Sequence, residues 1–286
     1  MTSNGFEGFR DWVGRQREEH DTITEWPVRA MHATLDRDAG EDLSGMALPP
    51  AWHWMYFLEA RRASQIARDG HPERGDFLPP VPLPRRMWAG GRIEWRAPLR
   101  VGERATRVSE ILSVEPKSGR TGTLVFVTVR HSISTAAGAA IVEEHDIVYR
   151  EAARPGDPVP PARPGPADPA WTRDWLPDEV MLFRYSALTF NGHRIHYDTP
   201  YATGTEGYPG LIVHGPLQAT LLLDLAQAHA APGLRLARFE YRALSPTFAG
   251  RPLSVNGIPA EDGHSAQVWA CGPGGGQTMA GTVDYA

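Results

Sequence analysis

One stretch limits the possible folds more than any other: Leu217-Gln-Ala-Thr-Leu-Leu-Leu-Asp-Leu-Ala-Gln-Ala-His-Ala-Ala231. It predicts a helix over Pro216–Ala230 that ends at Pro232-Gly233, residues that stop helices. This helix is apolar on nearly every side, whereas a helix lying on a sheet needs only one apolar stripe. We therefore expect it to be surrounded by the strands of its own unit.

Four strand-like segments follow this helix. One helix with strands curled around it is the hot-dog arrangement, in which the sheet is the bun and the helix is the filling. An ordinary α+β domain with two packed helices remains the alternative. The expected strands are Leu234–Leu244, Leu253–Ile258, Ser265–Cys271 and Gln277–Tyr285.

The first half of the chain has the same order of elements, without a convincing residue-level repeat. It predicts a helix over Ala51–Asp69, stopped by Gly70, and then strands rich in β-branched residues. Two such units can pair their sheets edge to edge as an internal pseudo-dimer. The predicted fold is therefore α+β, a double hot dog. The expected strands of the first half are Gly91–Trp95, Ala105–Val114, Thr123–Ser134 and Ala140–Tyr149.

A proline-rich segment separates the two halves. Residues 154–170 contain seven prolines, so this segment favours an extended, semi-rigid spacer. We expect an N-terminal unit over residues 1–153, this linker, and a C-terminal unit over residues 171–286.

Composition excludes several classes of protein. The 286 residues are 41% hydrophobic and 22% charged, which is enough for a sizeable core. The net charge of −5 argues against a nucleic-acid binder, and we find no apolar stretch of the roughly 20 residues that a membrane span needs. Cys271 is the single cysteine, and the N-terminus shows no signal-peptide pattern. We therefore expect a cytoplasmic protein in which Cys271 is a buried apolar residue.

A dense polar cluster follows the strand-like run that begins at Leu182. It contains Asn191, His193, His196 and Asp198 within eight residues. Imidazole is the natural proton carrier at neutral pH, which makes His196 the candidate acid/base. An isolated histidine is more often a core residue satisfied by hydrogen bonds, but this one is not isolated. Asn191-Gly192 is first a turn signal, and its carboxamide can also point into a site.

Two histidines of the cluster raise the question of metal binding. His193 and His196, with Asp198 and His214 nearby, resemble a metal-ligand set, but the spacing matches no established motif, and we predict neither a metal nor a cofactor.

The start of the central helix is a second candidate feature. His214 and Gly215 precede Pro216 there. Free N–H groups at such an end can stabilise an oxyanion, and a glycine lets a ligand approach closely, although a mere helix cap is also possible.

These residues resemble the motif of the MaoC-like family of (R)-specific enoyl-thioester hydratases and dehydratases. That family carries Asp-x-Asn-Pro-x-His, followed about two dozen residues later by a His-Gly that opens the central helix of a hot-dog fold. Here the first segment reads Asn191-Gly-His-Arg-Ile-His196, and the second reads His214-Gly215. His196 and Gly215 match. Asn191 stands where the family has its catalytic aspartate, and His193 stands where it has asparagine.

The resemblance narrows to a branch that includes mesaconyl-C4-CoA hydratases and mitochondrial-type 3-hydroxyacyl-thioester dehydratases. Its members are double hot dogs whose N-terminal half resembles the dehydratase-like domain of type I fatty acid synthases. The segment Pro84-Arg-Arg-Met-Trp-Ala-Gly-Gly-Arg-Ile-Glu-Trp95 is similar to the corresponding part of that branch. The resemblance thus spans most of the chain, and it is more specific in the C-terminal half.

The resemblance implies reversible hydration of an enoyl thioester to a 3-hydroxyacyl thioester. It makes His196 the acid/base and the N–H of Gly215 the oxyanion donor. A carboxamide cannot exchange a proton as a carboxylate does, so Asn191 is expected to fix the water. His193 or Asp198 then supplies the missing second group.

The expected partner is a CoA or acyl-carrier-protein thioester, and the expected assembly is a homodimer of double hot dogs. Arg85, Arg86 and Arg194 are candidates for contacts with CoA phosphates. A small dicarboxylic substrate such as mesaconyl- or itaconyl-CoA would need a cation inside the cavity to bind its free carboxylate, and Arg184 and Arg194 are candidates for this cation. A hot-dog thioesterase using Asp224, or a non-catalytic acyl-thioester binding protein, are the alternatives.

Overall fold

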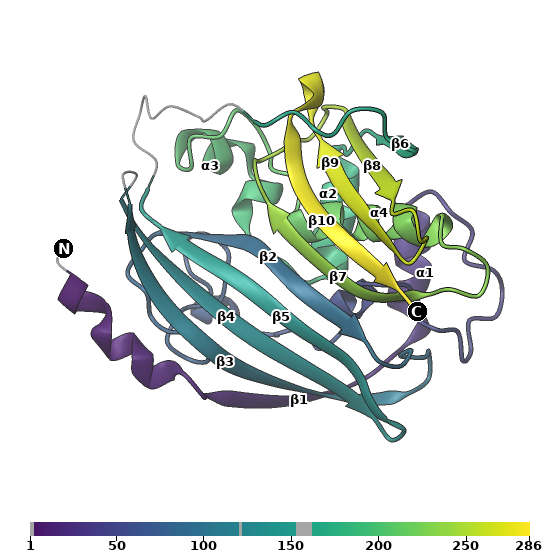
Figure 1. Cartoon of the computed structure of the whole chain (residues 1–286). Coiled ribbons are helices and arrows are strands. Elements are labelled where there is room, and N and C mark those ends of the chain that lie inside the picture. The colour runs from purple at the N-terminus through teal and green to yellow at the C-terminus, as the bar shows by residue number, and fades with distance from the viewer. Residues whose placement is uncertain (1–2, 120–121, 153–161) are drawn as a thin grey trace.

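The computed structural model describes residues 3–119, 122–152 and 162–286 (Figure 1). Residues 154–161 of the predicted linker therefore lie outside the described residues. The helices are α1 Glu25–Thr34, α2 Glu179–Leu188, α3 Thr199–Gly204 and α4 Gly215–Ala228. Short 3-10 helices are Ser3–Trp12, Trp52–Met55, Ala63–Gln65, Arg194–His196 and Pro273–Gly275. The strands are β1 Gln16–Thr22, β2 Arg85–Trp95, β3 Arg104–Gly119, β4 Gly122–Thr135, β5 Gly138–Arg150, β6 Trp171–Trp175, β7 Leu236–Ala243, β8 Leu253–Pro259, β9 Ser265–Cys271 and β10 Gln277–Tyr285.

In the described part of the chain, ten strands form one antiparallel sheet in the order β1-β3-β4-β5-β2-β7-β10-β9-β8-β6. The two halves of this order repeat each other, because β1 to β5 are arranged as β6 to β10 are, and the halves meet at the β2–β7 pair. There, residues 90–94 pair with residues 238–242. The predicted double hot dog with edge-to-edge sheets is confirmed.

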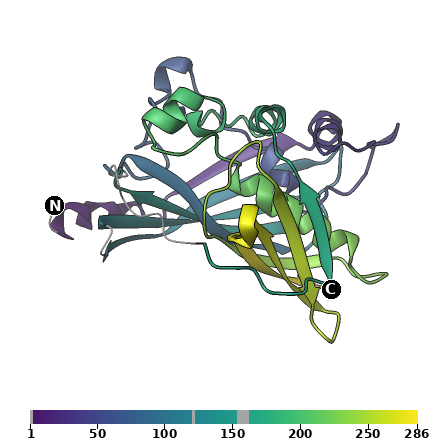
Figure 2. The same cartoon turned by 90° about the horizontal axis from the view of Figure 1, so that it is seen from above.

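The central helix of the second half behaves as its composition predicts. Helix α4 contacts all five strands of its own half, and nine of its residues are buried. Figure 2 shows α1, α2 and α3 on one side of the curved sheet. An apolar helix is thus enclosed between the sheet and other parts of the chain, which explains why it carries no polar stripe.

The strand predictions of both halves are confirmed in position, although β1 and β6 were not predicted. The predicted helix over Ala51–Asp69 is wrong. This segment forms only two short 3-10 helices, and Ala51 and Phe57 have positive φ values of 67° and 56°, which interrupt a helix. Of the apolar side chains that suggested this helix, Trp52 and Met55 are buried, whereas Leu58 and Ile66 are exposed.

The segment that looked strand-like before the polar cluster was also misjudged, because it forms helix α2. Its buried residues Leu182, Tyr185 and Ser186 follow helical spacing, and the Asp178 side chain caps the helix by accepting the N–H of Met181. Cys271 is buried, as predicted. Among the described residues, no helix is long and apolar enough to span a membrane.

The first half consequently has a curved sheet without a long central helix. Its β-strands β2 to β5 are as long as 11 to 16 residues, and part of their inner face carries no helix comparable with α4. The last residues of the predicted linker lie instead along the far end of the other half, where Gln277 donates its N–H to the carbonyl of Arg163. The space left in the first half becomes part of the cavity described below.

The junction between the halves offers a test of the fold. Phe239 on β7 is fully buried, stacks on Tyr241 at 4.7 Å between ring centroids and pairs with Ile93 of β2. We expect Phe239→Ala to lower the free energy of unfolding by about 3–5 kcal/mol, since it removes a large buried side chain and leaves a cavity. Urea denaturation measures this. The exposed Leu244→Ala is the control and should stay within about 0.5 kcal/mol of the wild type; equal effects of the two changes would contradict the junction.

Candidate active site

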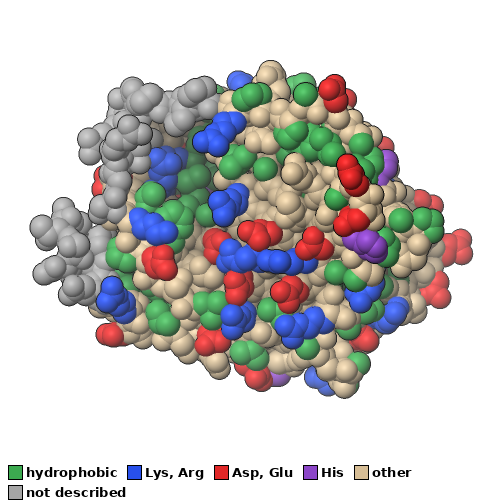
Figure 3. All heavy atoms as spheres, in the orientation of Figure 1, with side chains coloured by type: hydrophobic (Ala, Val, Ile, Leu, Met, Phe, Trp, Pro, Cys, Tyr) green, Lys and Arg blue, Asp and Glu red, His purple; other side chains and the backbone are tan. Residues whose placement is uncertain are grey.

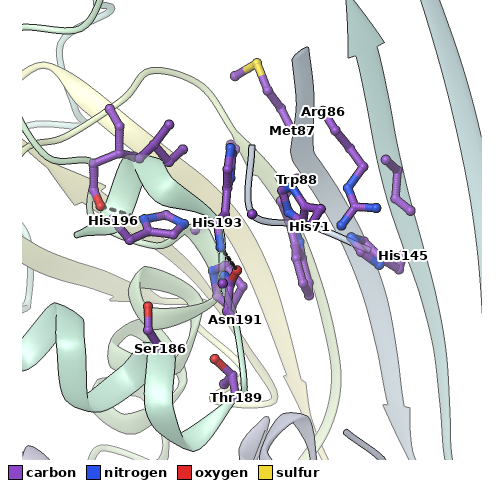
Figure 4. Close-up of a pocket in the computed structure, with 18 of the residues that line it drawn as sticks. His71, Arg86, Met87, Trp88, His145, Ser186, Thr189, Asn191, His193 and His196 are labelled. Carbon is purple, nitrogen blue, oxygen red and sulfur yellow. Dashed lines mark hydrogen bonds between the residues drawn. The ribbon is translucent and has the colours of Figure 1, made fainter. Parts of the chain in front are cut away.

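A cavity of about 2260 Å³ is lined by residues of both halves. Four of the predicted site residues line it: Asn191, His193, His196 and Gly215. Figure 4 shows His196 and His193 on one side, with Trp88 and Arg86 opposite. The cavity therefore lies where the β2 region of the first half faces the polar cluster of the second half.

His196 is held as a neutral base. It lies in the 3-10 helix Arg194–His196, is only 7% exposed, and its Nδ1 lies 2.8 Å from the carbonyl oxygen of Ile212. A carbonyl only accepts, so Nδ1 carries the proton and Nε2 keeps a free lone pair. Burial lowers the pKa of His196 to about 4, although the Ile212 carbonyl opposes this. At neutral pH the imidazole is ready to accept a proton.

His214 supports His196 from behind. It is completely buried, and its ring stacks on that of His196 at 3.6 Å between centroids. Its Nε2 lies 2.8 Å from the Ser186 hydroxyl, and burial keeps its pKa well below the ordinary value. His214 does not line the cavity, so its position suits it to hold the His196 ring rather than to contact a ligand.

Gly215 is the first residue of α4 and borders the cavity. The N–H groups of the first helical turn have no partner within the helix and lie at the positive end of its dipole. A Cβ built on Gly215 would make an ordinary van der Waals contact with Trp88 at 3.8 Å, so Trp88 lies directly beside this residue. An anionic oxygen in the cavity can approach the backbone here.

Asn191 serves the local turn. Its Oδ1 accepts the backbone N–H of His193 at 3.0 Å, as its turn signal predicted. Its amide nitrogen has no protein partner among the described residues, and the residue lines the cavity. The carboxamide is thus fixed at one end and free at the other.

A loop of the first half, which the sequence did not reveal, completes this side of the site. The His71 ring lies 4.1 Å from that of His193, and His71 Nδ1 lies 3.2 Å from Asp69 Oδ2. Burial and the charge of Arg86 lower the pKa of His71 to about 4, against the effect of Asp69. Gly70 makes the contact possible: its φ is +91°, and a Cβ would lie 1.8 Å from the carbonyl oxygen of Gly192. In the sequence Gly70 looked only like a helix stop.

A second buried polar group lies in the first-half part of the cavity. Glu143 accepts hydrogen bonds from His53 Nε2 at 2.9 Å and Trp54 Nε1 at 3.0 Å. Burial raises the pKa of Glu143, but the His53 hydrogen bond and nearby imidazoles outweigh it and lower the value to about 2. His131 and His145 line the cavity beside it. No motif in the sequence pointed to this group.

Besides His214, three predicted site residues lie outside the cavity lining: Asp198, Arg194 and Arg184. Asp198 caps α3 through the N–H of Tyr201 and forms an ion pair with Arg194 at 2.6 Å. Arg194 also donates to the carbonyl of Arg68. Arg184 is exposed on α2 and donates to the carbonyl of Ala33 at 3.3 Å. Neither arginine is therefore positioned as an internal cation.

Other candidates are also engaged elsewhere. Asp224 of α4 forms ion pairs with Arg37 and Arg173 in a separate shallow pocket, so it cannot act as a thioesterase residue in this cavity. Arg85 lines the cavity but pairs with Glu206 at 2.9 Å.

The residues that could hold a metal differ from the predicted set. The potential ligand atoms of Asp69, His71 and His193 lie within 4.8 Å of one another. In the set that the sequence analysis considered and set aside, by contrast, His196 uses Nδ1 for a carbonyl and Asp198 lies outside the cavity lining.

The cavity between two hot-dog units is thus bordered by a buried neutral histidine and a helix N-terminus, an arrangement that suits a thioester hydro-lyase. A model of the family described as hydroxyacyl-thioester dehydratase type 2 matches residues 51–249. The chain is 46% identical over 276 residues to the mesaconyl-C(4)-CoA hydratase of Chloroflexus aurantiacus, with 96% of each chain covered. The chain belongs to the hydroxyacyl-thioester dehydratase type 2 family and is a hydro-lyase.

Solved structures agree on the fold. A MaoC-like dehydratase superposes with a TM-score of 0.72 at 16% identity, covering 96% of this chain and 99% of the other. A Mycobacterium tuberculosis protein described as a double hotdog fold gives a TM-score of 0.56 at 13% identity and covers 96% of each chain. Both likenesses concern the fold alone.

The buried histidines predict how stability depends on pH. The pKa values of His71, His145 and His196 are lowered to about 4 and that of His131 to about 3, in each case mainly by burial. Between about pH 6.5 and about pH 4 the unfolded chain binds protons that the folded chain does not. Stability should therefore fall as the pH drops through this window, by up to about 1 kcal/mol per pH unit for each histidine.

Urea denaturation at several pH values between about 7.5 and about 5 measures this slope. The exposed His229→Ala variant is the control and should leave the slope unchanged. An equal stability of the wild type at both ends of the range would contradict the neutral, buried state of these side chains.

Proposed function

We propose that the protein reversibly hydrates a short enoyl-CoA thioester to the 3-hydroxyacyl thioester in the cavity between its halves. One observation carries the proposal: His196, with Nε2 unprotonated, and the start of α4 at Gly215 border the same cavity. A base and an oxyanion donor are the two groups that this reaction needs.

In the proposed mechanism His196 Nε2 takes a proton from water while the oxygen forms a bond to C3. The electrons of the C2=C3 π bond move toward the thioester carbonyl, whose oxygen becomes negative and faces the N–H of Gly215. The second proton-transfer group then protonates C2, which restores the thioester, and it recovers its proton from the protonated His196. The reverse sequence eliminates water from the 3-hydroxyacyl thioester.

For the second proton-transfer group we propose His193. Its ring lies 5.6 Å from that of His196 and nearly perpendicular to it, and His71 and Asp69 lie behind it. An ionised Asp69 stabilises positive charge on this pair while a proton moves. Asn191, whose amide nitrogen is free, then orients the water. Asp198 is less suited to the role because it caps α3.

For the substrate we propose a small branched or dicarboxylic enoyl-CoA of the mesaconyl or itaconyl type. The support is the name of the relative with 46% identity, mesaconyl-C(4)-CoA hydratase. In this proposal residues 171–286 supply the catalytic motif, and residues 1–153 supply the acyl pocket in the space without a central helix. Arginines that border the cavity, Arg150 and Arg163 among them, would meet CoA phosphates. Figure 3 shows basic side chains around a hollow in the face drawn there.

We further propose that the protein works in the cytoplasm and forms a homodimer of double hot dogs. A single, buried thiol suits a reducing compartment. Light scattering on the purified protein measures the mass, and a monomer would remove the dimer from the proposal.

The first test is enoyl hydration itself, followed as loss of enoyl absorbance with crotonyl-, mesaconyl- and itaconyl-CoA. We expect His196→Ala to reduce kcat by about 10²- to 10⁴-fold, the usual contribution of a general acid/base. His229→Ala removes a histidine that stacks on Trp171 away from the cavity, and it should keep wild-type activity. Unchanged activity of His196→Ala would overturn the mechanism.

The second test concerns the partner of His196. We expect His193→Ala to reduce kcat at least about tenfold, because it removes the second proton-transfer group. Asn191→Asp should retain or increase turnover, since a carboxylate can also accept the His193 N–H and can exchange a proton. Loss of turnover in Asn191→Asp, with the fold intact by circular dichroism, would count against a shared site.

The same assays separate the alternatives. Release of free thiol from acyl-CoA would reveal a thioesterase. Tight acyl-CoA binding without turnover across the panel would reveal a binding protein.

A further inference from the structure

Arg86 is a cation in the cavity wall without an acidic partner. It belongs to β2, is half-buried and borders the cavity together with His71 and His145. Figure 4 shows its guanidinium beside His145, on the side of the cavity opposite His196. Within residues 3–119, 122–152 and 162–286, no carboxylate forms an ion pair with Arg86.

The acidic groups of this region already have partners. Asp69 accepts from His71 through both its backbone N–H and its ring. Glu143 accepts from the His53 ring and the Trp54 indole. Neither carboxylate is available to neutralise Arg86.

Other arginines around the cavity differ from Arg86 in this respect. Arg74 donates to backbone carbonyls of Val81 and Leu83, and Arg61 forms an ion pair with Glu59 at 2.8 Å. Their donors are used to hold the loop in place. In the described part of the chain Arg86 has instead the neutral Tyr149 hydroxyl beside it, which leaves its charge unmatched. A half-buried guanidinium in this situation gains most from a bidentate anion.

The surroundings of Arg86 favour a ligand with negative charge. Burial, helped by the Arg86 charge, lowers the pKa of His71, so this imidazole is neutral and adds no competing positive charge. His145 Nε2 is buried and has no hydrogen-bond partner among the described residues. A group that accepts several hydrogen bonds would satisfy these donors together.

We propose that Arg86 binds a free carboxylate on the acyl group, so that the enzyme prefers CoA thioesters of short dicarboxylic acids. The identity of the thioester rests on the proposed function, but the carboxylate contact rests on the cavity itself. Carboxylate and guanidinium match as a planar, two-pronged pair, and a carboxylate entering this cavity without such a partner would lose its hydration. Arg86 thus sets substrate choice, while the proton transfers take place at the other side of the cavity.

Binding of two unreactive ligands tests this inference without any turnover. Succinyl-CoA and butyryl-CoA carry four-carbon acyl groups that differ in a terminal carboxylate. Calorimetry should show that the wild type binds succinyl-CoA about 10- to 100-fold more tightly. Arg86→Gln should remove this preference by weakening succinyl-CoA alone, and Arg86→Lys should keep part of it.

Arg96→Gln is the matched control, because it removes an exposed arginine just beyond the same strand. It should leave both affinities unchanged. Equal binding of the two ligands by the wild type would overturn the proposal. So would equal weakening of both ligands by Arg86→Gln, since that result assigns Arg86 to the CoA moiety or to the fold.

Hydration rates distinguish this inference from the proposed function. Arg86→Gln should lower kcat/KM for mesaconyl-C4-CoA by about 10- to 100-fold and leave crotonyl-CoA, which lacks a carboxylate, nearly unchanged. If the wild type hydrates neither thioester but still prefers succinyl-CoA, the proposed reaction fails and the carboxylate site stands. If it hydrates both while Arg86→Gln has the same effect on each, the reaction stands and the carboxylate site fails.

Discussion

The pairing of β2 with β7 is the interaction on which the site depends. Each half alone would expose a sheet edge, and pairing residues 90–94 with residues 238–242 removes both edges at once. The loop around Gly70 lies directly against Gly192, and the N–H of Arg194 donates to the carbonyl of Asp69 at 2.9 Å. The strand pairing also brings Trp88 to the start of α4, where its indole donates to the Tyr241 hydroxyl at 2.8 Å. The site is therefore a property of the joined sheet.

Burial is the second constraint. Burying imidazoles keeps them neutral, which gives His196 a free lone pair at neutral pH but makes the fold sensitive to acid. The same burial would make an unpartnered ionised group costly, and Asp69 and Glu143 accordingly carry two donors each. Arg86 departs from this rule, which is why a ligand is needed to explain it.

Features of the structure that depend on a local sequence pattern could be predicted from the sequence. The wholly apolar helix, the β-branched strands and the motif around His196 and Gly215 are each readable within a few residues, and each is found where it was expected. The prediction of a helix over Ala51–Asp69 is wrong because the positions of apolar residues do not reveal the positive φ values that interrupt the helix. Asp69 and His71 were missed because they lie more than a hundred residues from His193 and reach it only through the joined sheet.

The substitution at Asn191 becomes understandable on this basis. In the family pattern one short segment carries both the aspartate and the histidine, so the first half need supply only a pocket. Here that position is Asn191, and the proposed mechanism takes its carboxylate from the other half: Asp69 bonds to His71, whose ring lies 4.1 Å from that of His193. A charge held by a neighbouring loop can support a proton on an imidazole nearly as well as one on the same turn, provided that the loop is fixed. The close approach of Gly70 to Gly192 fixes this loop, and in the proposed mechanism the two halves thereby share work that the resemblance assigns to one.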